Sequence, residues 1–177
     1  MIRLNIKEKL KGYFLMNPTK KMRVREIERE VNIPLPSAIR YCKELNQEGI
    51  LKIIKMGNIQ FYTADRSNEN YKLEKKLFNL KQIYKSKIIA SIKESLNNPS
   101  IILFGSYAKG EDIEDSDIDI YLETPSKKTI NLKKFEKTLQ RKIQIFKFSN
   151  LNQISNKHLA NNIINGITLN NPIAVFK

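Results

Sequence analysis

Hydrophobic residues recur at helical spacing in the first third of the chain. Three segments of residues 1–66 carry apolar positions every three or four residues, which predicts three helices. They are Ile6–Met16, "VREIEREV" (residues 24–31) and "SAIRYCKEL" (residues 37–45). Gly49 is placed to cap the third helix. After it, "LKIIK" and "IQFYT" flank "MGN", which predicts a β-hairpin.

Three helices followed by a hairpin resemble the winged helix-turn-helix of bacterial and archaeal regulators. In that fold the third helix enters the major groove of double-stranded DNA and the hairpin tip contacts the backbone. The outward residues are Ser37, Arg40 and Lys43 on the helix, with Lys55 and Asn58 at the hairpin. Arg40 suits a guanine edge, whereas Lys43 and Lys55 suit phosphates. A winged helix used only for protein contacts is the alternative.

Residues 67–98 read as a long amphipathic connector helix that ends before Pro99. Its apolar positions follow each other at spacings of three and four: Leu73, Leu77, Leu80, Tyr84, Ile88, Ile92 and Leu96. Such a stripe packs on the following domain or pairs with its copy in a homodimer. The sequence leaves both alternatives open.

The hydrophobic pattern changes after residue 99, where "IILF" predicts a short buried strand. Gly105 allows a sharp turn after it, and Ser106 offers a hydroxyl that suits a phosphate. In the next predicted strand, "SDIDIYLE", Asp117 and Asp119 alternate with isoleucines, so the two carboxylates share one face. Residues two apart on a strand are roughly 6–7 Å apart, which allows both carboxylates to hold magnesium.

The combined stretch "FGSYAKGEDIEDSDIDIYL" resembles the DNA polymerase β nucleotidyltransferase superfamily, in particular its minimal branch. The resemblance covers about residues 99–177, and the whole chain resembles archaeal proteins that join a winged helix to such a domain. It implies that Gly105 and Ser106 hold the triphosphate of an NTP, with ATP the expected nucleotide, and that Asp117 and Asp119 bind two Mg²⁺ ions. Lys109 either approaches a phosphate or is solvated.

One residue departs from the superfamily pattern. A third carboxylate usually stands on a later strand, which here is "RKIQIFKF", and its position between Ile143 and Ile145 is occupied by Gln144. Glu123 and Glu136 are the alternatives for this carboxylate, although neither stands at the matching position. Because an amide supplies neither charge nor a proton acceptor, this departure predicts weaker binding of a second metal.

Two functions therefore remain. The first is a Mg²⁺-dependent enzyme that transfers a nucleoside monophosphate to a hydroxyl, with a toxin-like protein as one specific acceptor, because some members of the branch are antitoxins that adenylylate a toxin. The second is a DNA-binding transcriptional regulator that only senses NTP. The expected fold is α+β or α/β, with a small mixed sheet in the second domain.

The distribution of charge is consistent with an N-terminal domain that binds nucleic acid. The chain has 177 residues and a formal net charge of +14, and residues 1–66 carry 14 Lys and Arg against 7 Asp and Glu, as expected for a module that binds a polyanion. A solvated lysine-rich surface explains the charge equally well. A single cysteine, Cys42, excludes an intramolecular disulfide, and no segment reads as a signal peptide or membrane span. We therefore expect a cytoplasmic protein.

Overall fold

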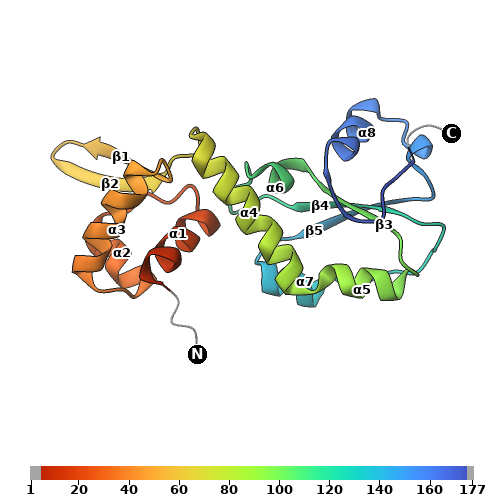
Figure 1. Cartoon of the computed structure of the whole chain (residues 1–177), viewed down its shortest axis with the longest axis horizontal. Coiled ribbons are helices and arrows are strands. Elements are labelled where there is room, and N and C mark those ends of the chain that lie inside the picture. Colours follow the sequence, from red (N-terminus) through yellow and green to blue (C-terminus); the bar gives the residue numbers. More distant parts are fainter. Residues whose placement is uncertain (1–4, 175–177) are drawn as a thin grey trace. The chain divides into compact units, whose positions relative to one another are not determined.

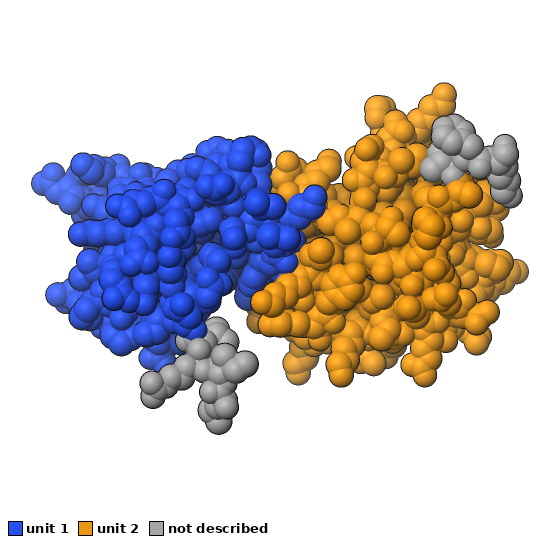
Figure 2. Space-filling model, viewed as in Figure 1, with its two compact units in different colours: residues 1–78 blue, residues 79–177 orange. Residues whose placement is uncertain are grey.

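The computed structural model describes residues 5–174 and divides into two compact units, Met1–Phe78 and Asn79–Lys177. Figure 2 shows the two units in different colours. The division falls inside residues 67–98, the predicted connector, so this segment is shared between the two units.

The first unit contains the helices and the hairpin in the order that the sequence predicts (Figure 1). Its elements are α1 (Ile6–Met16), α2 (Val24–Val31), α3 (Leu35–Gln47), β1 (Leu51–Met56) and β2 (Ile59–Ala64). Apolar residues of the three helices form one core, in which Cys42 is fully buried. Gly49 has φ +73° directly after the third helix, as expected for a glycine cap.

The connector is two helices, so the prediction of one continuous helix over residues 67–98 is wrong. Helix α4 spans Glu69–Ser86 and α5 spans Ile88–Ser95, with Lys87 between them at φ +62°. The Ser86 hydroxyl donates to the Ile83 carbonyl at 2.7 Å and accepts from the Ile88 amide at 3.3 Å. These local bonds compete with the helical hydrogen-bond pattern and end α4.

The predicted apolar stripe does not remain on one buried face. Leu73, Leu77 and Tyr84 are 53–56% exposed, whereas the positions of the stripe in α5 are buried in the second unit. The buried face of α4 instead carries Lys75, which is 1% exposed and donates from its Nζ to the Leu15 carbonyl at 2.6 Å. A satisfied hydrogen bond thus allows a lysine to occupy a buried helix position.

The second unit is built on a four-stranded mixed sheet of order β5-β4-β3-β6, which fits the predicted architecture. The strands are β3 (Ser100–Phe104), β4 (Ile118–Glu123), β5 (Ile143–Phe148) and β6 (Ile167–Asn170). Strand β3 is antiparallel to both neighbours, and β4 is parallel to β5.

Helices cover both faces of this sheet. The remaining helices are α6 (Gly105–Lys109), α7 (Lys133–Leu139), the 3₁₀ turn η1 (Leu151–Gln153) and α8 (Lys157–Ile164). Helices α5 and α7 pack on the face that carries Ile118 and Ile120, and α8 lies on the opposite face beside Tyr121 (Figure 1). His158 is exposed on α8.

None of the helices within residues 5–174 combines the length and the apolar character that a membrane crossing requires.

Candidate active site

The turn after β3 lies directly against a carboxylate. Phe104, the last residue of β3, pairs with Asp119 on β4. The next residue, Gly105, has φ +74°, and a Cβ atom there would overlap the Oδ2 atom of Asp119. Only glycine fits both the backbone conformation and the space. The first residue of the Gly-Ser turn is therefore required by its contact with the acid.

Asp117 and Asp119 flank a buried residue at the start of β4. Ile118 and Ile120 are fully buried, so Asp119 points to the other face of the sheet, and Asp117 is exposed immediately before the strand. Burial raises the pKa of Asp119 above its usual value, and the negative charge of Asp117 raises this pKa further. The two carboxylates therefore interact electrostatically, as like charges that share a site do.

The position expected for a third carboxylate lies beside this pair. Gln144 on β5 stands in register with Asp119, and its side chain is exposed. Glu123 accepts a hydrogen bond from Tyr121 at the far end of β4, and Glu136 accepts one from the Ile143 amide at 3.0 Å. Neither glutamate replaces the missing carboxylate at the Gln144 position.

The carboxylate pair fits magnesium in part. Two carboxylates are enough for Mg²⁺, which takes its other ligands from water and substrate phosphates. However, no group of three or more His, Cys, Asp and Glu side chains within residues 5–174 is arranged to hold a metal ion.

The other predicted phosphate contacts lie on α6, the five-residue helix that begins at Gly105. Ser106 is half-buried near its start, and Lys109 is exposed at its end. The helix closes at Gly110, which has φ +75°.

A buried polar cluster holds the loop that connects α6 to Asp117. Asp112 is 1% exposed, and its Oδ2 atom lies 3.9 Å from the Nη2 atom of Arg141. Asn79 donates from its Nδ2 atom to Asp112 Oδ1 at 2.6 Å and to the Tyr107 carbonyl at 2.9 Å. The cluster joins α4, the loop and the segment before β5. The sequence pattern did not reveal Asn79, Asp112 and Arg141 as a cluster, because Asp112 looks like one more acid in an acidic stretch.

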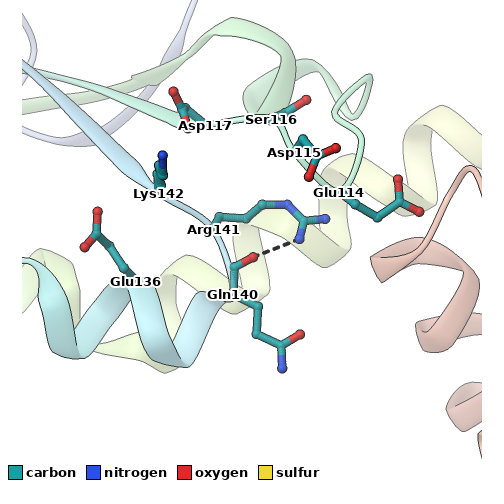
Figure 3. Close-up of a pocket in the computed structure, with 8 residues that line it drawn as sticks. All are labelled: Glu114, Asp115, Ser116, Asp117, Glu136, Gln140, Arg141 and Lys142. Atoms are coloured by element: carbon teal, nitrogen blue, oxygen red, sulfur yellow. Dashed lines mark hydrogen bonds between the residues drawn. The ribbon is translucent and has the colours of Figure 1, made fainter.

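A cavity of about 540 Å³ opens beside Asp117 at the start of β4 and β5 (Figure 3). The residues that line it are Glu114, Asp115, Ser116, Asp117, Glu136, Gln140, Arg141 and Lys142. Both acidic and basic side chains face it, so it suits a ligand that carries phosphates together with a cation.

In the first unit, the predicted DNA contacts are accessible. Arg40, Lys43, Lys55 and Asn58 are exposed, and Ser37 is half-buried. The Arg40 guanidinium lies 4.3 Å from the centre of the Tyr41 ring, and its Nε atom lies 3.6 Å from Glu44. Both partners lie on the same helix, α3, as Arg40.

Comparison with known families bears on the second unit. The family model of the nucleotidyltransferase domain matches residues 85–169, just under half of the chain. A search of curated proteins and a search of solved structures found no match. The matched range contains the Gly105 turn, both aspartates and Gln144. Over residues 85–169 the chain is thus similar to nucleotidyltransferase domains, and this similarity supports a nucleotidyltransferase activity in general terms.

The raised pKa of Asp119 predicts how stability depends on pH. A carboxyl group whose pKa is higher in the folded state destabilises the fold as pH rises above its usual value of 3.8. Asp119→Asn should therefore raise the midpoint of thermal unfolding by a few degrees at pH 7 without metal, and by less near pH 3.5. Scanning calorimetry measures this, with Asp115→Asn, an exposed aspartate in the loop that precedes β4, as the control. An equal shift for Asp119→Asn at both pH values would contradict the prediction.

Proposed function

We propose that this protein is a Mg²⁺-dependent nucleotidyltransferase that transfers a nucleoside monophosphate from an NTP, with ATP as the expected donor, to a hydroxyl group. The observation that carries the proposal is the contact between Gly105 and Asp119, which brings the phosphate-binding turn and the acidic pair together. The family match over residues 85–169 supports the same reaction class.

Each residue has a distinct role in this proposal. Gly105 and Ser106 bind the triphosphate, and Lys109 contacts a phosphate from the end of α6. Asp117 and Asp119 hold Mg²⁺, which when bound offsets the charge of the triphosphate and favours attack by the hydroxyl. The acceptor oxygen bonds to the α-phosphorus, and the bond from this phosphorus to the bridging oxygen of the β-phosphate breaks. Pyrophosphate leaves, and the hydroxyl proton passes to water.

Gln144 sets the expected rate. With an amide in place of the third carboxylate, the site carries one negative charge less, so it holds a second Mg²⁺ weakly. We therefore expect binding of one Mg²⁺ with the nucleotide and slow turnover. A toxin-like protein is one specific acceptor, because some members of the minimal branch that the sequence resembles are antitoxins that adenylylate a toxin.

Pyrophosphate release tests the proposed reaction. With Mg²⁺, ATP and candidate acceptors, Asp117→Asn should lower the rate at least about 100-fold, because the metal loses a charged ligand. Gln144→Asp should raise it. Glu111→Gln is the matched control, because this exposed acid precedes Asp117 in the same loop and does not line the cavity. Release at the wild-type rate by Asp117→Asn would rule out this site as the catalytic centre.

A second candidate function is supported by the first unit. We propose that residues 1–66 form a winged helix that binds double-stranded DNA, so that the protein acts as a transcriptional regulator, with the second unit sensing NTP if it does not turn over. The support is the basic charge of this segment and the exposure of Arg40, Lys43, Lys55 and Asn58. A homodimer through Leu73, Leu77 and Tyr84 is compatible with their exposure.

Fluorescence anisotropy with labelled duplexes tests DNA binding. Lys43→Ala and Lys55→Ala should weaken binding to all sequences and lower the salt dependence, because lysines of this kind contact phosphates. Arg40→Ala should mainly reduce discrimination between sequences selected from a random library. Lys76→Ala, which removes an exposed lysine from α4, is the control. Equal weakening by Lys76→Ala would indicate nonspecific attraction rather than a winged-helix interface.

A further inference from the structure

Lys142 stands beside Asp117 in the same way that Gln144 stands beside Asp119. Strands β4 and β5 are parallel, with Ile118 opposite Ile143 and Asp119 opposite Gln144. The pairing continues one residue further, because the Ile118 amide donates to the Lys142 carbonyl at 2.9 Å. Lys142 is therefore next to Asp117 across the strand pair.

The alternation of side chains along strands places these groups together. Ile118 and Ile143 are buried in the core on the face of the sheet that α5 and α7 cover. The residues on either side of each isoleucine consequently point away from that core. Asp117, Asp119, Lys142 and Gln144 form a four-residue group at the start of the two strands, with two negative charges, one positive charge and one neutral amide.

Lys142 is also accessible and unpaired. It is exposed and lines the same cavity as Asp117 (Figure 3). The neighbouring Arg141 points to Asp112 and donates from its Nη1 atom to the Gln140 carbonyl at 2.9 Å. Within residues 5–174, Lys142 forms no ion pair that would hold its ammonium group away from a ligand. Lys142 is thus the basic residue of the cavity that is free to bind an anion.

We propose that Lys142 binds the phosphates of the NTP beside Asp117, an inference that rests on the proposed nucleotidyl transfer at this site. A lysine ammonium is a compact charge that binds phosphate without requiring a fixed geometry. Because Gln144 weakens the second metal position, the fixed charge of Lys142 supplies part of the neutralisation that the triphosphate needs. Unlike a metal, this charge is present in every molecule and remains when divalent cations are removed.

The test is nucleotide binding without metal. Titration calorimetry with ATP, and separately with inorganic tripolyphosphate, is performed in EDTA and then with Mg²⁺. Lys142→Ala should weaken the binding of both ligands about 10-fold in EDTA, as expected for the loss of one charged hydrogen bond. Lys142→Arg should keep most of the affinity. Lys137→Ala is the matched control, because it removes an exposed lysine of α7 that does not line the cavity.

The outcomes separate this inference from the proposed function. Wild-type affinity of Lys142→Ala for ATP and tripolyphosphate in EDTA would overturn the role of Lys142, even if the wild type releases pyrophosphate. Equal weakening by Lys137→Ala would also overturn it, because it would reveal only a general effect of charge. Specific weakening by Lys142→Ala in a protein that releases no pyrophosphate would support the phosphate contact and reject nucleotidyl transfer. Absence of ATP binding by the wild type in both EDTA and Mg²⁺ would overturn both.

Discussion

The contact between Gly105 and Asp119 is the constraint on which the rest of the candidate site depends. It follows from the register of β3 and β4, which sets Phe104 opposite Asp119 and leaves no space for a side chain at the next residue. The backbone must turn there with a positive φ, and α6 begins at the turn. Strand pairing, chain direction and the position of the carboxylate are thus determined together, before any ligand binds.

A second constraint comes from charge that is buried rather than exposed. An aspartate as buried as Asp112 is costly unless it is paired, and the cost is offset by Arg141 and by hydrogen bonding from Asn79. Adjacent residues of an extended chain point their side chains in opposite directions. Because the Arg141 side chain points inward to Asp112, the Lys142 side chain points toward the edge of the cavity. The same short segment therefore stabilises the loop before Asp117 and supplies a cation to the site.

Much of this architecture could be predicted from periodicity, because helices and strands with one buried face leave a clear pattern. The position of Gln144 beside Asp119 was expected only from the superfamily resemblance, because alternation along each strand does not set the register between two strands. The break at Lys87 could not be predicted in this way, because it results from hydrogen bonds of Ser86. The buried face of α4 was also missed, because Lys75 and Asn79 are buried with hydrogen-bond partners that lie far away in the sequence.

The most direct test of the proposed site is a crystal structure with Mn²⁺ and an ATP analogue that cannot be cleaved between the α- and β-phosphates. The account predicts an anomalous peak bound by Asp117 and Asp119, with the triphosphate against Gly105 and Ser106. A nucleotide bound elsewhere, with neither metal nor phosphate at the two aspartates, would contradict it.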